Sequence, residues 1–362
     1  MADLILNSAH NKYPVGADPW VSGTVEAVGC LAEKGEPMLC STDPVPWNLA
    51  LFLAGRKTLD IGLIVKACED DRGYHEYGLI LDEYALDRKR TYPLFIGEIS
   101  PGRPKKIWPL RDRYAIAAAD AIYPVSIRPG GKLDTLLSGN GLNPKVRSDF
   151  RIAWETPGKM PAYDFTDKPV NPLPGRDWLV HWTRSSQGPW PGEKAWEFYR
   201  DLLDRPETYV RSARETLSRI LREGVIRSTA WRLPDGVSAV SFTSLDPENA
   251  VPLMRWRKRF VRYSFEPYGI GIRKDVLAGL GAKPVRYTDG SSVYEGRERL
   301  FAQSAGARGD WRKEREWRFH GDVSIGDIPA DDLIVIVPDG DTARDFELSA
   351  GGKYRMHALF GE

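Results

Sequence analysis

The segment Trp311–His320 reads Trp-Arg-Lys-Glu-Arg-Glu-Trp-Arg-Phe-His and carries acidic and basic side chains at regular spacing. Side chains of a β-strand alternate between its two faces, so a strand here would place Trp311, Trp317 and Phe319 together against a core. Two carboxylates among three potential cations on the other face would suit the floor of a polar cleft. A solvated strand face with weak ion pairs is the alternative interpretation. The residues of this polar face are Arg312, Glu314, Glu316, Arg318 and His320.

Two further side chains on predicted strands complete a set with this segment. His181 lies near the end of a predicted strand over 178–184, Tyr268 begins another over 268–272, and Glu316 lies on the later strand. A His, a Tyr and a Glu in this order resemble the arrangement of the ADP-ribosyltransferase fold. The resemblance implies an α+β domain that uses NAD as its substrate.

The chemistry of NAD explains why these residue types are needed. Cleavage of the nicotinamide–ribose bond develops positive charge on the ribose, as in glycoside hydrolysis, and the Glu316 carboxylate would stabilise that charge. The Tyr268 ring would stack on the nicotinamide, and His181 would donate a hydrogen bond to a ribose oxygen. Each residue also has a structural interpretation: a hydrogen-bonding His, a core Tyr, and a Glu316–Arg318 ion pair. Glu314 is an alternative to Glu316 as the functional carboxylate, because both side chains would lie on the same face of the predicted strand.

Several short motifs follow one another between residues 178 and 340. They are His181-Trp-Thr183, Leu-Ser-Arg-Ile-Leu-Arg-Glu-Gly at 217–224, Val-Ser-Phe-Thr-Ser at 240–244, Leu-Met-Arg-Trp at 253–256, Tyr-Gly-Ile-Gly-Ile at 268–272, Pro-Val-Arg-Tyr at 284–287 and Trp-Arg-Lys-Glu-Arg-Glu-Trp-Arg at 311–318. Their order and spacing resemble the AbiGi-like family of abortive phage-resistance proteins, which looks related to ADP-ribosyltransferase folds. The resemblance implies an effector in phage defence or a toxin that binds NAD through His181, Thr183, Tyr268 and Arg318. The chain departs from many related sequences at Thr229–Gly236, where an Asn-Asp-Pro-Phe-like turn is missing.

A basic cluster, Arg-Trp-Arg-Lys-Arg-Phe-Val-Arg, spans residues 255–262. Cations interleaved with aromatic rings suit the phosphates and bases of a single-stranded nucleic acid, and a solvated face is the alternative. The residues expected to make such contacts are Arg255, Trp256, Arg257, Lys258 and Arg259.

Short apolar segments alternate with helix-like segments along the first ~150 residues, which predicts a parallel sheet covered on both faces by helices. Strands are expected over 4–7, 37–41, 59–66, 92–96 and 121–127, and helices over 20–34, 46–54, 75–88 and 111–120, with an apolar segment over 133–137. Ligands of such sheets bind beyond the carboxyl ends of the strands, where His10, Asp43, Arg128 and Lys132 are expected. The glycine-rich turn from Arg128 to Lys132 could offer N–H groups and positive charge to a phosphate, or be an ordinary surface turn. The layout vaguely resembles the Rossmann-like domain of DprA proteins and LOG-type nucleotide hydrolases, which implies a nucleotide-type signal.

These elements predict a Rossmann-like α/β domain over 1–150, a linker or arm over 151–177, and an ADP-ribosyltransferase-like α+β domain over 178–362. Within the last, amphipathic helices are expected over 192–204 and 207–223. Residues 1–8 show no signal-peptide pattern, and no apolar run approaches the roughly 20 residues of a membrane span. The 362 residues carry a net charge of +1, and the three cysteines have neither metal-ligand nor disulfide spacing. We therefore expect a cytoplasmic protein without a metal site or a membrane partner.

Three functions fit this organisation. The first is an ADP-ribosyltransferase or NAD glycohydrolase that modifies an unknown protein or nucleic-acid acceptor. The second is a non-catalytic regulatory or antitoxin-like protein that binds a nucleotide. The third is a nucleic-acid-binding protein that uses the basic cluster.

Overall fold

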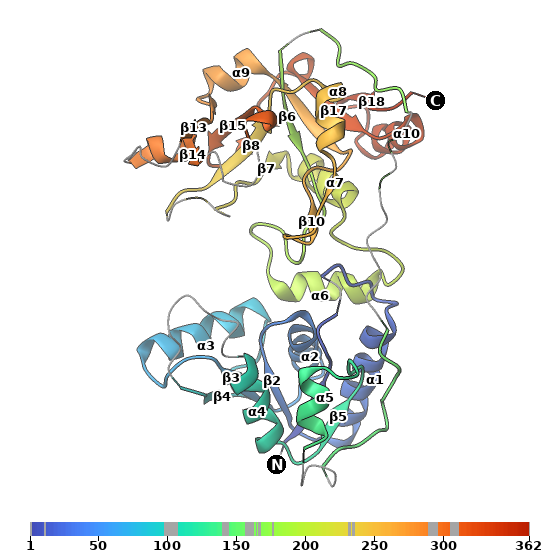
Figure 1. Ribbon diagram of the computed structural model, residues 1–362, viewed down its shortest axis with the longest axis vertical. Coiled ribbons are helices and arrows are strands. Elements are labelled where there is room, and N and C mark those ends of the chain that lie inside the picture. The colour runs from blue at the N-terminus through green and yellow to red at the C-terminus, as the bar shows by residue number, and fades with distance from the viewer. Residues whose placement is uncertain are drawn as a thin grey trace. The chain divides into compact units, whose positions relative to one another are not determined.

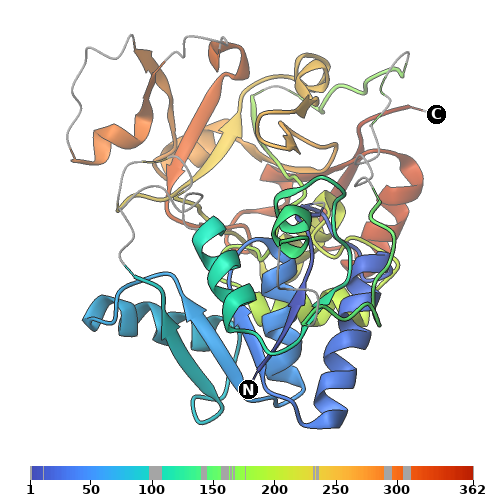
Figure 2. The ribbon, with the colours of Figure 1, turned by 60° about the horizontal axis from the view of Figure 1, so that its bottom comes forward.

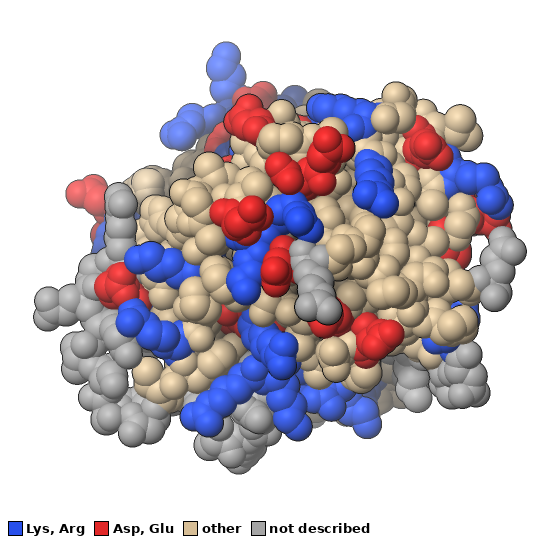
Figure 3. Space-filling view, turned by 90° about the horizontal axis from the view of Figure 1, so that it is seen from above, with Lys and Arg blue, Asp and Glu red and all other residues tan. Residues whose placement is uncertain are grey.

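The computed structural model describes residues 2–10, 12–97, 108–139, 145–155, 163, 165, 168–175, 177–230, 233, 236–288, 296–304 and 311–361. The chain divides into two compact units (Figure 1). Unit 1 comprises Met1–Met160 and Glu193–Val210, and unit 2 comprises Pro161–Gly192 and Arg211–Glu362. Acidic and basic side chains are interspersed on the face drawn in Figure 3, in keeping with the net charge of +1.

Unit 1 is built on a five-stranded sheet in the order β4-β3-β2-β1-β5, in which every neighbouring pair is parallel. The strands are β1 (Asp3–Leu6), β2 (Met38–Ser41), β3 (Ile61–Val65), β4 (Thr91–Phe95) and β5 (Ile122–Pro124). The helices are α1 (Pro19–Lys34), α2 (Val45–Arg56), α3 (Asp71–Glu83), α4 (Trp108–Ala118), α5 (Lys132–Leu137) and α6 (Ala195–Asp204).

Apolar side chains leave both faces of this sheet, as continuous apolar runs require. Ile5 and Leu63 belong to the core that contains α1, α2 and α3, whereas Leu4 and Ile64 belong to the core that contains α4 and α5. The views in Figures 1 and 2 show helices on either side of the sheet. The structure confirms the predicted parallel sheet covered by helices, which is compatible with a Rossmann-like domain.

The ends of the helices follow from local chemistry. Helix α1 ends at Lys34 because Gly35 adopts a left-handed conformation with a φ of 69°, as the sequence predicts. Helix α2 extends to Arg56, two residues beyond the end of the helix predicted over 46–54. The expected helix over 75–88 begins earlier, at Asp71, because the Asp70 side chain accepts a hydrogen bond from the Gly73 N–H.

Helix α6 lies in unit 1, although the sequence analysis assigns residues 178–362 to one domain. Its apolar face, Phe198, Tyr199 and Leu202, is buried in the same core as α2. The ring of Tyr199 stacks on that of Phe52 at 5.8 Å. Burial of these large side chains stabilises the helix where it is, because a short helix on its own is marginal in water.

Unit 2 contains a seven-stranded sheet in the order β12-β15-β8-β6-β11-β17-β18. Its strands are β6 (Trp178–Trp182), β8 (Ala239–Thr243), β11 (Gly269–Arg273), β12 (Lys283–Pro284), β15 (Glu316–His320), β17 (Leu333–Val337) and β18 (Arg355–Ala358). All neighbours are antiparallel except β17 and β18. Short pairs join β7 (Val225–Ile226) to β16 (Val323–Ser324), β9 (Trp256–Arg257) to β10 (Arg262–Tyr263), and β13 (Arg286–Thr288) to β14 (Ala302–Ser304). The helices are α7 (Ala213–Glu223), α8 (Pro247–Ala250), α9 (Lys274–Gly279) and α10 (Gly340–Ser349), with 3₁₀ turns η2 (Val251–Leu253), η3 (Gly296–Phe301), η4 (Trp311–Glu314) and η5 (Ala330–Asp332).

The predicted helix over 207–223 is shorter than expected. Helix α7 begins at Ala213, because the Ser212 side chain accepts a hydrogen bond from the Glu215 N–H. Val210 is fully buried in the core of unit 1, so the chain leaves that unit just before α7 starts.

The strand expected over 311–320 is half strand and half 3₁₀ turn. Residues Trp311–Glu314 form η4, and only Glu316–His320 form β15. Arg315 separates them with a φ of 43°, a left-handed conformation that interrupts an extended chain. Within β15 the predicted parity holds: Trp317 and Phe319 pack against a core, and Arg318 lies on the opposite face.

No helix in the described ranges is long and apolar enough to cross a membrane. All three cysteines, Cys30, Cys40 and Cys68, are free thiols.

Candidate functional site

A cavity of about 660 Å³ opens in unit 2 beside the junction of β6 and β8. The two strands pair only at Val180 and Thr243. Beyond this pair, the His181 imidazole takes the place of a backbone group: its Nδ1 lies 2.8 Å from the carbonyl oxygen of Ser241. Separation of two neighbouring strands therefore creates the cavity, and His181 satisfies a carbonyl that the separation exposes.

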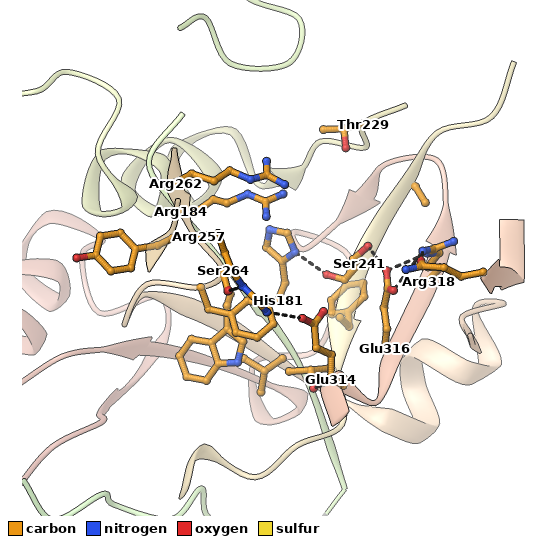
Figure 4. Close-up of a pocket in the computed structure, with 18 of the residues that line it drawn as sticks. His181, Arg184, Thr229, Ser241, Arg257, Arg262, Ser264, Glu314, Glu316 and Arg318 are labelled. Atoms are coloured by element: carbon orange, nitrogen blue, oxygen red, sulfur yellow. Dashed lines mark hydrogen bonds and ion pairs between the residues drawn. The ribbon is translucent and has the colours of Figure 1, made fainter. Parts of the chain in front are cut away.

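Glu316 is fixed on the floor of this cavity by hydrogen bonds to both carboxylate oxygens (Figure 4). The Arg318 guanidinium donates to them at 2.9 and 3.1 Å, and the Ser241 hydroxyl donates to Oε1 at 2.8 Å. Arg318 is itself 6% exposed and also donates to the carbonyl of Leu300 and to Gln303. The Glu316 carboxylate thus has a fixed orientation and a compensating positive charge, and it still lines the cavity.

Ser241 connects the two predicted functional residues. Its carbonyl accepts the hydrogen bond from His181, and its hydroxyl donates to Glu316. A carbonyl can only accept, so the hydrogen sits on Nδ1 of the neutral ring, and Nε2 is left as an acceptor. Burial lowers the pKa of His181 to about 4, so the ring is neutral at physiological pH.

Glu314 also lines the cavity, although it reaches it from η4 and not from the strand. Thr243 donates to the Glu314 carbonyl at 2.5 Å, and the Arg257 guanidinium lies 3.4 Å from the carboxylate. Burial, and then the charge of Glu316, raise the pKa of Glu314. Two neighbouring carboxyl groups in different environments can divide the work of charge stabilisation and proton transfer.

One wall of the cavity is basic. Arg184 follows β6, while Arg257 and Arg262 come from the hairpin β9–β10. In the view of Figure 4, the side chains of Arg184 and Arg262 reach toward the His181 ring. Three guanidinium groups and two carboxylates around one cavity would suit a ligand with an anionic and a cationic part.

Two predicted site residues lie outside the cavity wall. Tyr268 packs against the apolar core below the sheet, in line with Ile270 and Ile272, which share its parity. Thr183 is 2% exposed, and its hydroxyl donates to the carbonyls of Ala213 and Tyr268. Of the predicted residues, His181, Glu316 and Arg318 therefore line this cavity, whereas Tyr268 and Thr183 are not among its lining residues. The aromatic rings on the cavity wall are instead Phe242, Phe260, Tyr263, Phe265 and Trp182.

The basic cluster forms the hairpin β9–β10. Arg257 lines the cavity, whereas Arg255, Lys258 and Arg259 are exposed to solvent. Trp256 is half-buried, with its ring edge-on to Tyr263 at 5.2 Å.

The predicted residues of unit 1 follow β1, β2 and β5, three adjacent parallel strands whose carboxyl ends share one edge of the sheet. The order of strands reverses between β1 and β5, where such sheets bind ligands. Here the Arg128 N–H donates to the Ser8 hydroxyl at 2.8 Å, and Asp43 lies 3.4 Å from the amino group of Lys66. Lys132 begins α5.

His10 stacks on Trp20 with ring centroids 4.7 Å apart, and burial lowers its pKa to about 4. Its buried Nε2 has no hydrogen-bond partner in the described part of the chain. A ligand site at this edge remains a prediction.

Ser241 and Arg184 are not among the predicted site residues, and Arg262 is predicted only as part of the basic cluster over 255–262. Ser241 lies between the apolar Val240 and Phe242 on β8, so parity could have placed it on a polar face. Nothing in the sequence indicates that β6 and β8 separate at this point.

Comparison with known proteins gave no matching family model, no matching curated protein and no matching solved structure.

Proposed function

We propose that unit 2 cleaves the nicotinamide–ribose bond of NAD and transfers the ADP-ribosyl group to an acceptor. The observation that carries this proposal is the meeting of His181 and Glu316 in one cavity, bridged by Ser241, from strands far apart in the sequence. A directed carboxylate is the group that a positively charged ribose requires. The basic wall supplies partners for the diphosphate of the substrate.

The residues of the cavity suggest a division of roles. Glu316 stabilises the positive charge that develops at the ribose C1′ as the bond to nicotinamide breaks, with both electrons leaving on nicotinamide. Nε2 of His181 accepts a hydrogen bond from a ribose hydroxyl, because Nδ1–H is already committed to Ser241. The acceptor atom then bonds to C1′, and its proton passes to Glu314, whose pKa is raised by burial and which is therefore a stronger base than an ordinary glutamate.

Tyr268 is half-buried against the core and is not among the residues that line the cavity, which favours a second candidate, a unit that binds a nucleotide without cleaving it. No ring from the predicted position is available to hold nicotinamide in a strained pose. In that case the cavity would serve a regulatory or antitoxin-like protein.

Release of nicotinamide from NAD, measured by chromatography, separates the two candidates. Turnover that Glu316→Gln abolishes supports the transferase. Binding of NAD that raises the melting temperature, without nicotinamide release, supports the regulatory candidate instead.

An NAD-consuming enzyme removes a metabolite on which its own cell depends, which is chemistry suited to phage defence or to a toxin. Such an activity requires a trigger. We propose that unit 1 senses a nucleotide-type signal at the edge that carries Asp43 and Arg128. Binding of nucleotides to the full chain, weakened by Arg128→Gln, would test this role.

A further inference from the structure

The hairpin β9–β10 concentrates positive charge at the mouth of the cavity. Residues 255–262 contain five cations and no acidic residue in a chain whose net charge is only +1. Glu314 offsets Arg257 from within the cavity. Lys258 and Arg259, at the tip of the hairpin, are exposed and form no ion pair within the described ranges.

The same hairpin places an aromatic ring between the exposed cations and the cavity. Phe260 is half-buried and lines the cavity. The guanidinium carbons of Arg259 and Arg262 lie 5.7 and 5.8 Å from the centre of its ring. Cations beside an aromatic ring can hold phosphates while a base stacks on the ring.

The hairpin tip is held in place from outside the hairpin. The Gln187 amide donates hydrogen bonds to the carbonyls of Phe260, at 3.1 Å, and of Val261, at 2.5 Å. Val261 has a φ of 51°, a left-handed conformation that is unfavourable for a β-branched residue and persists only where its surroundings fix it. The cations at the tip are therefore presented on a fixed support.

We propose that the hairpin β9–β10 binds the phosphate backbone of a single-stranded nucleic acid and presents one of its nucleotides to the cavity as the acceptor, an inference that rests on the function proposed above. A base nitrogen or a sugar hydroxyl would supply the atom that bonds to C1′, and its proton would pass to Glu314. A single strand is favoured over a duplex as the acceptor, because its nucleotide can enter the cavity without the cost of leaving a paired base stack. An acidic protein would satisfy the cations but would give Phe260 no base to stack on.

The test measures binding of a labelled oligonucleotide of about 20 residues to the full chain by fluorescence anisotropy, over salt from about 50 to about 300 mM. Single-stranded DNA and RNA of the same sequence are measured separately, and the one that binds more tightly shows whether the hairpin prefers deoxyribose or ribose. Lys258→Gln/Arg259→Gln should weaken binding about ten-fold or more and lower the slope of log Kd against log salt by about 1.4, the share of two phosphate contacts. Arg222→Gln/Lys353→Gln removes the same charge from exposed sites outside the cavity and should leave the slope intact.

Phe260→Leu keeps an apolar side chain but removes the aromatic face. It should weaken binding about ten-fold without a change in the salt slope, because stacking makes no phosphate contact. Equal losses in the hairpin and control variants, or binding as tight to a duplex, would overturn the proposal. Competition by polyglutamate as strong as that of an unlabelled oligonucleotide would overturn it in favour of an acidic protein.

Glu316→Gln separates this inference from the proposed function. The variant should bind the oligonucleotide like the wild type and transfer no labelled ADP-ribose to it. Nicotinamide release by the wild type without oligonucleotide binding would overturn only the docking surface. Oligonucleotide binding without nicotinamide release would overturn the proposed function and, with it, the acceptor role.

Discussion

Replacement of Glu316 by Gln tests the centre of the proposed chemistry, and the structure predicts two separable effects. The first is on turnover: loss of one electrostatic stabiliser should lower the rate of nicotinamide release by about 10²-fold or more. The second is on stability, because the Arg318 side chain is only 8% exposed and would lose its counter-charge. Breaking a buried ion pair lowers the free energy of unfolding by about 3–5 kcal/mol. Because the Gln carbonyl can still accept a hydrogen bond from Arg318, we expect a loss of about 3 kcal/mol.

A loss of that size corresponds to a fall of about 6–12 °C in the melting temperature of a unit of this length. The variant Glu316→Gln/Arg318→Met removes both charges and should recover part of the stability, since an apolar side chain needs no counter-charge, although the Leu300 carbonyl loses its donor. It should not recover turnover. Glu314→Gln, assayed beside it, should lower turnover much less, because the acceptor's proton can also pass to solvent.

Scanning calorimetry and nicotinamide release, measured on these variants, distinguish a catalytic role of Glu316 from a structural one. If turnover returns together with stability in the double variant, Glu316 serves only to hold Arg318 in place. If Glu314→Gln is the more damaging change, the two carboxylates exchange their roles.

Three further predictions concern other parts of the molecule. Ser241→Ala should lower turnover about ten-fold with little change in melting temperature, because it removes one hydrogen bond to Glu316 at a solvent-exposed position; Ser244→Ala is the matched control, and equal effects would contradict the bridging role. His10 has its pKa lowered to about 4 by burial, whereas the unfolded chain takes up a proton near pH 6.5. The stability that its neutral ring contributes is therefore present above pH 6.5 and lost as the pH falls toward 4, so His10→Gln should reduce the pH dependence of the melting temperature of unit 1; an unchanged profile would contradict this. Leu202→Ala should destabilise unit 1 by about 2–5 kcal/mol and raise hydrogen exchange in β1–β5; faster exchange confined to unit 2 would refute the placement of α6.

The architecture of unit 1 could be predicted because its signals are local. A strand such as Ile61–Val65 is apolar at nearly every position, which indicates burial on both faces and hence a parallel sheet with helices around it. Gly35 marks the end of a helix by its own conformational freedom. Such features depend on a few consecutive residues, and the sequence displays them directly.

The site in unit 2 could be predicted only in part. The alternation of Glu316, Trp317 and Arg318 is visible in the sequence and holds in β15. The left-handed turn at Arg315 is not visible, because a non-glycine residue with positive φ is imposed by its surroundings. Tyr268 shares its parity with the apolar Ile270, so the alternation argument applied to Glu316 also predicts a buried ring there.

The interruption of unit 1 by residues of unit 2 has a consequence for the order in which the chain can fold. During synthesis, the sheet β1–β5 is complete long before α6 emerges, and the apolar side chains of α2 that α6 covers remain uncovered in the interval. A single cut after residue 160 would release a nascent unit with that surface open, and a single cut after residue 210 would strip unit 2 of β6, the strand that carries His181. The two units therefore cannot be separated by one cleavage, and a protease that nicks the chain once would damage at least one of them. The stretch from Trp178 to Ala213 thus links completion of unit 1 to completion of unit 2 within one polypeptide.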